Sequence, residues 1–227
     1  MLGLGALDTE WNDAAEPMFY VGLAIQLPLG LLLMVRWITK TVQIKMCNPA
    51  CLIGPVGILL VGLAFARIHV TEIAYLCYSA SLFWWIMIFA QFLHRLLFIG
   101  LLPAKLIPMF FILLAPPMIA TACTYELFGD TPMVYVFYSI GLFFALLLVW
   151  MTPLFVKALK HFELTWLAFV FPCASFAIGS MEVYGLTDSM FYGVIAWFGL
   201  GLSQLVFAGV SIATLVNVIR GKVFLPE

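Results

Sequence analysis

Long apolar stretches, separated by short polar segments, follow one another along the whole chain. Between Glu163 and Glu182, for example, 18 consecutive residues carry no charge, and between Asp188 and Arg220 there are 31. A transmembrane helix needs about 20 such residues, because lipid solvates neither charges nor unpaired backbone groups. The pattern predicts an all-α integral membrane protein with seven transmembrane helices, at residues 17–38, 50–66, 70–98, 106–125, 132–153, 164–181 and 189–219.

The composition points to the same environment. Of the 227 residues, 65% are hydrophobic and only 9% are charged, whereas soluble domains carry about 25% charged residues. The lipid bilayer is therefore the expected partner. The formal net charge of −1 leaves no basic excess that would hold a nucleic acid. Five cysteines, an odd number found mostly in apolar runs, are interpreted as small core residues and not as a disulfide framework.

Lys and Arg are concentrated on one side of the predicted membrane. The loops on that side hold nine of them, and Arg67 is the only one on the other side. Because positive flanks stay in the cytoplasm during insertion, we predict an extracytoplasmic N-terminal segment (1–16), a transmembrane domain (17–219) and a cytoplasmic tail (220–227). Acidic residues precede the first helix where a signal peptide is basic, so no cleavage is expected. The expected location is the plasma (cell inner) membrane.

Every second predicted helix carries proline in or near its middle. These prolines are Pro55, the pair Pro116 and Pro117, and Pro172, spaced by about the length of one helical hairpin. Proline frees a backbone carbonyl, which is tolerated in a membrane where it faces protein or a water-filled cavity. We therefore predict that the helices over 50–66, 106–125 and 164–181 line an internal space while the other helices form an outer wall. Chance is the alternative explanation, since proline is common in transmembrane helices.

Several functional classes are not expected. No Asp, Glu, Lys or Arg occupies the middle of a predicted helix, which argues against a proton relay through carboxylates. The last helix has no lysine for a retinal Schiff base, and the third ends in His94-Arg95 where common receptors have an acidic residue before Arg. No nucleophile–base set or carboxylate pair lies together at one membrane face, so we expect neither an enzyme nor a cofactor.

Two polar clusters lie near the predicted membrane edges, and neither is interpreted as a functional site. Cys47 and Cys51 have the outline of a metal-binding pair, but a second pair of ligands is missing, so no metal is expected. Arg67, His69 and Glu72 lie together at the outer turn between the second and third helices. We expect a local salt bridge there, and not a metal or substrate site.

Three collinear stretches resemble the tellurite-resistance/dicarboxylate transporter family, which includes the slow-type anion channels of plants and the malic acid permease of yeast. The first stretch, residues 48–57, reads NPACLIGPVG and opens the second helix. The second, residues 102–117, reads LPAKLIPMFFILLAPP, with Leu-Pro, a second proline, Phe-Phe and Ala-Pro-Pro at the family spacing. The third, residues 166–172, reads WLAFVFP and is similar to the aromatic-rich entry of the family's ninth helix.

The resemblance implies a fold of ten helices in five hairpins around a pseudo-fivefold axis, with kinked helices lining a pore in each subunit of a homotrimer. The seven predicted helices correspond to helices four to ten of that scheme, so the first three are absent. The chain is then either an incomplete gene model, which we favour, or a shortened homologue that closes its ring differently.

The resemblance also implies a mechanism. In the family a phenylalanine of the ninth helix plugs the pore, and the matching residue is Phe171, directly before Pro172. Phe169 would point to a different helix face and is the weaker candidate. Ile58 and Ile107 stand where relatives often have a polar residue and a histidine, and they make the predicted lumen more apolar.

The function implied is a membrane anion channel or transporter that passes small anions, such as chloride, nitrate or a dicarboxylate such as malate. Freed backbone dipoles and a positive potential at the cytoplasmic mouth would support permeation. Two alternatives stay open at this point: a gradient-coupled dicarboxylate (malate) secondary transporter, and a non-conducting truncated homologue or scaffold.

Overall fold

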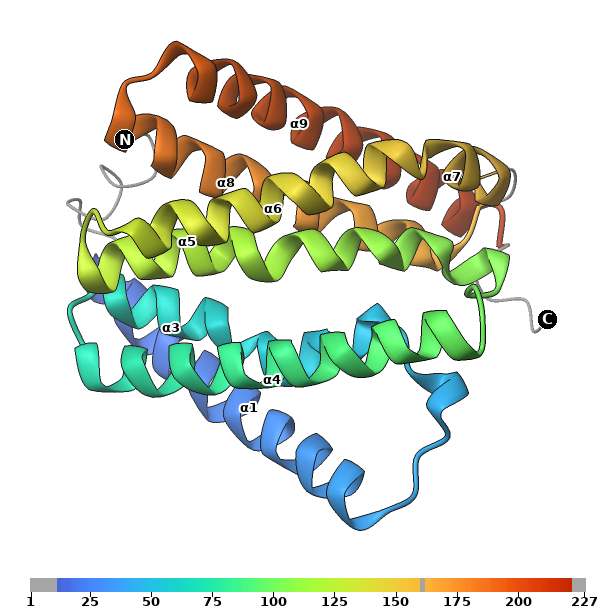
Figure 1. Cartoon of the computed structure of the whole chain (residues 1–227), viewed down its shortest axis with the longest axis horizontal. Coiled ribbons are helices and arrows are strands. Elements are labelled where there is room, and N and C mark those ends of the chain that lie inside the picture. The colour runs from blue at the N-terminus through green and yellow to red at the C-terminus, as the bar shows by residue number, and fades with distance from the viewer. Residues whose placement is uncertain (1–11, 160–161, 222–227) are drawn as a thin grey trace. The chain divides into compact units, whose positions relative to one another are not determined.

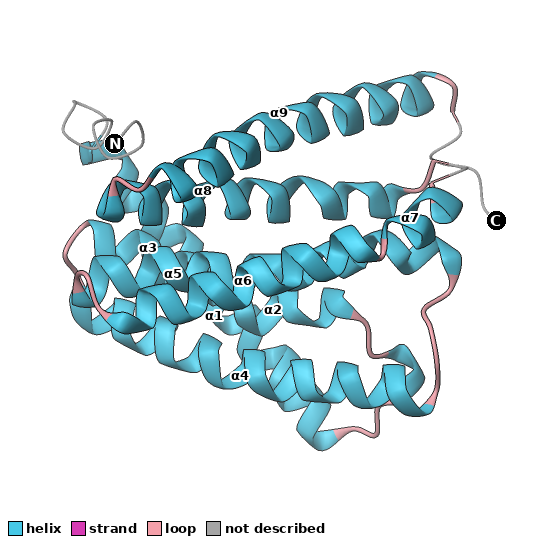
Figure 2. Cartoon of the chain, turned by 45° about the horizontal axis from the view of Figure 1, so that its top comes forward, coloured by secondary structure: helices cyan, strands magenta, loops and turns pink. Residues whose placement is uncertain are grey.

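The computed structural model describes residues 12–159 and 162–221. The described chain contains helices and turns without a strand, as Figure 2 shows. Most of the predicted N-terminal segment, Lys160 and His161, and the end of the predicted tail lie outside the described residues. Within the described part, six helices are long and apolar enough to cross a membrane, or seven if one bent pair counts as a single span. The predicted all-α membrane fold is confirmed.

The chain divides into two compact units, which are described separately. The first unit contains the described residues up to Ile99 together with Ala122–Val134, and the second contains Gly100–Thr121 and the described residues from Tyr135 onward. One helix, α5 (Ala115–Phe128), therefore contributes its first half to the second unit and its second half to the first.

In the first unit, α3 packs along α4, and α1 packs on α2 and α3. The bounds of these elements are α1 (Asn12–Thr39), η1 (Ile44–Met46), η2 (Pro49–Leu52), α2 (Ile53–Val56), α3 (Ile58–Arg67) and α4 (Thr71–Phe98). Figure 1 shows α3 and α4 as neighbours joined by a short turn. Phe65, Ala66 and Ala74 form the buried core beside this turn, and Phe19 of α1 and Leu127 of α5 pack against it.

In the second unit, α8 packs along α9 as a long hairpin, visible in Figure 1. The bounds of its elements are η3 (Ala104–Leu114), α6 (Pro132–Trp150), α7 (Thr152–Ala158), η4 (Leu164–Phe169), α8 (Val170–Thr187) and α9 (Met190–Ile219). The single helix expected over 132–153 is two helices that break at Met151. Pro153 explains the restart, because proline fits the first turn of a helix and not its interior.

Met118 of α5 is the central knob of the second unit. Its side chain is fully buried and fills a notch made by Gly141 of α6 and Gly179 of α8. A methyl group added at Gly141 would lie 2.9 Å from the Met118 Sδ atom, and one added at Gly179 would lie 3.0 Å from the Met118 carbonyl oxygen. Carbon contacts normally begin at about 3.5 Å. Three helices therefore meet here only because two of them carry glycine.

Candidate functional site

The segments that hold Pro55, Pro116 with Pro117, and Pro172 share one local design, which α1 lacks although it carries Pro28 in its interior. Each begins as a 3₁₀-helix and becomes α-helical at or just before its proline: η2 leads into α2, η3 into α5 and η4 into α8. A 3₁₀-helix rises by about 2.0 Å per residue against 1.5 Å in an α-helix. Each segment is therefore more extended in its first part, and the straight helices α4, α6 and α9 show no such start.

The position of each proline accounts for this transition. Pro55, Pro116, Pro117 and Pro172 all occupy the second or third residue of their α-helices. There the missing N–H removes no α-type hydrogen bond, because the first four N–H groups of an α-helix have no partner within it. All four prolines are buried. Beside Pro55 the chain also bends, by 40° between Val56 and Ile58.

The burial of the helices differs in the direction that the alternation predicts. Along the most apolar window of Ala104–Phe128, 83% of the residues are buried, against 33% for α4 and α6 and 11% for α9. The span Leu164–Thr187 is intermediate at 44%. A helix exposed over most of its surface is suited to face lipid, whereas one buried all round is suited to the interior. The prediction that a proline-containing helix lies in the interior is therefore supported most clearly for the span Ala104–Phe128.

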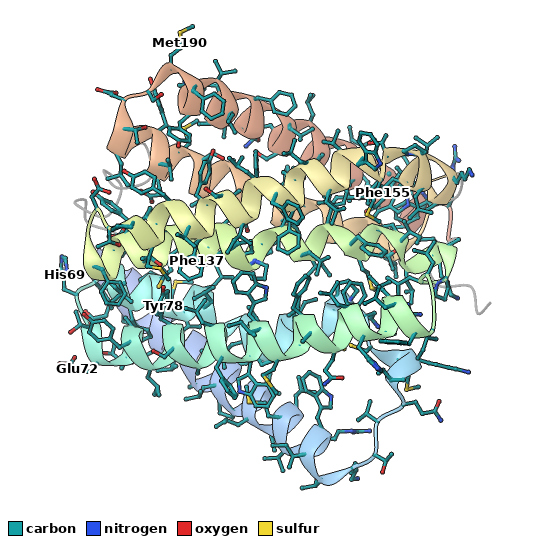
Figure 3. All side chains as sticks on the ribbon, in the orientation of Figure 1. His69, Glu72, Tyr78, Phe137, Phe155 and Met190 are labelled. Atoms are coloured by element: carbon teal, nitrogen blue, oxygen red, sulfur yellow. The ribbon has the colours of Figure 1, made fainter. Side chains whose placement is uncertain are left out.

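Phe169 and Phe171 flank the junction between η4 and α8 and lie in opposite environments. Phe169 is 8% exposed, and Phe171 is 45% exposed. The ring of Phe169 lies edge-to-face with two other rings. The centroid distance is 4.6 Å to Phe111 of η3 and 6.2 Å to Phe155 of α7. Phe111 and Phe155 contact each other at 5.1 Å, and Figure 3 labels Phe155. This aromatic trio holds the end of η4 in one orientation.

A hydrogen bond from a side chain to the backbone also joins the two 3₁₀ segments of the second unit. The Thr165 hydroxyl in η4 donates a hydrogen bond of 2.6 Å to the Lys105 carbonyl in η3. With Phe169 fixed in the trio, the ring two residues further along is directed to another side, since neighbouring residues on a helix are about 100° apart. The sequence pattern pointed to Phe171 but did not identify the trio that positions it.

The polar groups of the first unit form pairs between helices. Arg67 of α3 pairs with Glu126 of α5, with 3.0 Å between Nε and Oε1. The sequence suggested a local salt bridge with the neighbours of Arg67, but this partner is 59 residues away. The Tyr78 hydroxyl of α4 lies 2.7 Å from the Thr124 hydroxyl of α5. Figure 3 places Tyr78 on the ribbon of α4, Glu72 at the start of that helix and His69 at the turn before it.

Other residues differ from their expected surroundings. Ile58 and Ile107, expected to make a lumen more apolar, are each 1% exposed. Arg95, counted in the sequence only as a positive flank, is 4% exposed. Cys47 and Cys51 are only half-buried, whereas the other three cysteines are buried, as expected of core residues. Among the described residues, no group of three or more His, Cys, Asp or Glu could hold a metal ion.

These features can be compared with known proteins. The SLAC1 family, described as voltage-dependent anion channel, matches residues 1–215. The chain belongs to the SLAC1 family. The family resemblance found in the sequence is thereby confirmed, and so is the SLAC1-like all-α membrane fold.

Individual relatives are similar at low identity. The uncharacterized transporter MJ0576 of Methanocaldococcus jannaschii is 26% identical over 96% of this chain and 71% of its own length. The S-type anion channels SLAH1 and SLAH4 of Arabidopsis thaliana are 27% and 26% identical over 89% of this chain. The chain spans 53% and 56% of the length of these two plant channels. Membership in the SLAC1 family makes this a multi-pass membrane protein of a group of channels and transporters, and it supports anion transport in general.

Proposed function

We propose that this SLAC1-family chain passes small anions, such as chloride, nitrate or a dicarboxylate such as malate, through a pore that Phe171 closes. The observation that carries the proposal is the contrast at the start of α8. Phe169 is locked in the aromatic trio, while the ring of Phe171 is 45% exposed directly before a buried proline. An apolar ring exposed in a span that is otherwise half-buried is suited to narrow a lumen.

The physical mechanism is dewetting. An apolar ring in a narrow passage excludes the water that a hydrated anion needs, so the passage conducts only when the ring moves aside. The junction between η4 and α8 offers the place for that motion, because the hydrogen-bond spacing changes there from the 3₁₀ to the α type. Phe171 and the four prolines are thus proposed as gate and pore-helix kinks.

We assign the attraction of the anion to the Lys and Arg residues at the ends of the helices. A backbone carbonyl oxygen carries partial negative charge and repels an anion, so the proline junctions alone cannot select for one. Nine of the ten Lys and Arg residues fall on the proposed cytoplasmic side, where they raise the local concentration of anions. With the N-terminus outside and the C-terminus in the cytoplasm of a plasma-membrane homotrimer, this field would act at the inner mouth of each pore.

The test is anion efflux from liposomes that contain the purified chain, with chloride and nitrate as the probes. Phe171→Ala is compared with the natural chain and with Phe198→Ala, a matched change at an apolar ring of α9 that is 65% exposed. We expect Phe171→Ala to raise efflux about tenfold, which corresponds to a barrier lower by about 1.4 kcal/mol. Phe198→Ala is expected to behave like the natural chain. Equal efflux from all three proteins would contradict the gate.

The same experiment separates the alternatives. Uptake of malate that saturates and follows an imposed gradient would favour a dicarboxylate secondary transporter. No efflux from the natural chain or from Phe171→Ala would favour a non-conducting homologue or scaffold. The burial of Ile58 and Ile107, each 1% exposed, supports that last alternative, because neither side chain leaves room for water beside it.

A further inference from the structure

A side chain of α1 completes the backbone of the bent span in the first unit. In an unbroken α-helix the Gly54 carbonyl would accept a hydrogen bond from the Ile58 N–H, four residues later. Between these two residues the helix is interrupted, and α2 and α3 meet at an angle of 40°. The hydrogen bond that the structure shows at the Gly54 carbonyl comes instead from Nε2 of Gln26, at 2.8 Å.

The same amide reaches a second carbonyl at the break. Nε2 of Gln26 lies 3.4 Å from the Ile53 carbonyl oxygen, which also accepts a hydrogen bond of 3.1 Å from the Gly57 N–H. Both partners of the amide are oxygen atoms that can only accept, so its NH₂ group must face them. Glutamine fits this position because it donates, and an ionised carboxylate of the same shape would not.

Close packing keeps the amide in place. Gln26, Gly30 and Leu33 follow one another at intervals of four and three residues, so they share one face of α1. Glycines on the facing span let α1 approach. A methyl group added at Gly54 would lie 2.5 Å from the Leu33 Cδ1 atom, and one added at Gly57 would lie 2.7 Å from Nε2 of Gln26.

The surroundings of α1 make this contact unusual for the helix. Along its most apolar window only 11% of the residues are buried, so most of its surface is suited to face lipid. Between Glu16 and Arg36, Gln26 is the only residue with an amide side chain. An amide is costly in lipid unless it is hydrogen-bonded, and the bent span supplies the acceptors.

We propose that Gln26 is a positioning residue, whose amide replaces the helical donor at the Gly54 carbonyl and so holds the bent form of the span Pro49–Arg67. A carbonyl left unpaired away from water costs free energy, so the break opens more often without the amide. A second effect rests on the proposed function, in which this span lines the anion pathway. There the amide also covers two carbonyl oxygens whose partial negative charge would repel an anion.

The first test measures hydrogen–deuterium exchange of the purified full chain in detergent, in the peptide that covers residues 53–62. Gln26→Met keeps the size of the side chain and removes its donors, so it is expected to speed exchange in this peptide about tenfold. Gln204→Met, at an exposed glutamine of α9, is expected to leave the exchange rate there unchanged. Exchange at the natural rate in Gln26→Met would overturn the proposal.

Gln26→Glu separates hydrogen-bond donation from packing. Its carboxyl group has the shape of the amide, but it donates only when it is protonated. Each rate is compared with that of the natural chain at the same pH. We expect faster exchange in residues 53–62 at about pH 9, where the carboxyl is ionised, and a rate close to that of the natural chain at about pH 5.

A role in packing alone predicts no such recovery, and its absence would overturn the proposal. Gln204→Glu is the matched control, and we expect it to leave the exchange of residues 53–62 unchanged at either pH. The helical circular dichroism of each variant is recorded first. If Gln26→Met does not fold, the two pH values of Gln26→Glu decide.

The second effect is tested by chloride efflux from liposomes, with Phe171→Ala as the background that opens the proposed gate. Adding Gln26→Met is expected to lower efflux severalfold, and adding Gln204→Met to leave it unchanged. Unchanged efflux with faster exchange would overturn the second effect and keep the positioning role. No efflux from Phe171→Ala itself would contradict the anion pathway, whereas the exchange rates alone decide on the positioning role of Gln26.

Discussion

The notch around Met118 allows the packing of the second unit to be tested with single methyl groups. Gly141→Ala would place a carbon 2.9 Å from the Met118 Sδ atom and closer still to Cε, and Met118 is fully buried, so its side chain has no free space to enter. Overpacking of this kind costs about 1–3 kcal/mol. Gly201→Ala on α9 is the matched control, because nothing lies within 4 Å of the added methyl group there.

Removing the Met118 side chain separates two kinds of clash. The three atoms nearest to a methyl group at Gly141 all belong to the Met118 side chain, so Gly141→Ala should cost less when combined with Met118→Ala. A methyl group at Gly179 instead meets the Met118 carbonyl oxygen at 3.0 Å and its Cα at 3.3 Å, which remain in the variant. The Met118 Sδ atom, also at 3.0 Å, is lost in the variant, so Gly179→Ala should keep most, but not all, of its cost.

The assay is thermal unfolding of the detergent-solubilised protein, followed by circular dichroism, for each single and double variant. We expect a coupling energy of about 1–2 kcal/mol between Gly141→Ala and Met118→Ala, and less than about 0.5 kcal/mol for Gly201→Ala with Met118→Ala. The single change Gly201→Ala should leave the midpoint unchanged or raise it, since alanine is the better helix former. If Gly141→Ala costs the same with and without the Met118 side chain, the knob-and-notch explanation is wrong.

Two further changes probe the polar pairs of the first unit by the same unfolding assay. Glu126→Gln removes the carboxylate that lies 3.0 Å from the partly buried Arg67 guanidinium, so it should lower the free energy of unfolding by roughly 2 kcal/mol. The double change with Arg67→Gln should recover part of that stability, and equal costs for the single and double changes would refute the pairing. Tyr78→Phe removes one hydroxyl from the 2.7 Å contact with Thr124 and should lower stability by about 1 kcal/mol, whereas an unchanged midpoint would show that the contact contributes nothing.

The positions of the helices could be predicted because lipid imposes a simple rule on the chain. Charges are excluded from the spans and the backbone must bond to itself, so the gaps between charged residues mark the helices. The helix expected over 70–98 is observed as Thr71–Phe98, and the one expected over 189–219 as Met190–Ile219. The proline alternation was readable for the same reason, since proline has a fixed chemical effect on helical hydrogen bonds.

The contacts between helices could not be predicted in this way. Arg67 and Glu126 are 59 residues apart, and nothing in a single sequence distinguishes this acid from Glu72, which is closer along the chain. Arg95 stands in a cluster of basic flanks, so counting charges identified its side of the membrane but not its burial. The 3₁₀ starts were also missed, because a 3₁₀-helix and an α-helix differ by one residue in hydrogen-bond spacing and share the same apolar composition.

The 3₁₀ starts connect the packing of the second unit to the proposed gate. Leu164–Phe169 is wound more tightly than an α-helix, with three residues per turn instead of 3.6. Each residue converted from one form to the other would therefore rotate the following chain by about 20° about the helix axis. Phe169 lies at the last position of η4, so its contacts with Phe111 and Phe155 resist such a rotation. If Phe171 is a gate, the aromatic trio is the element that fixes its resting direction, and motion of the gate requires either a rotamer change of Phe171 alone or the release of Phe169 from the trio.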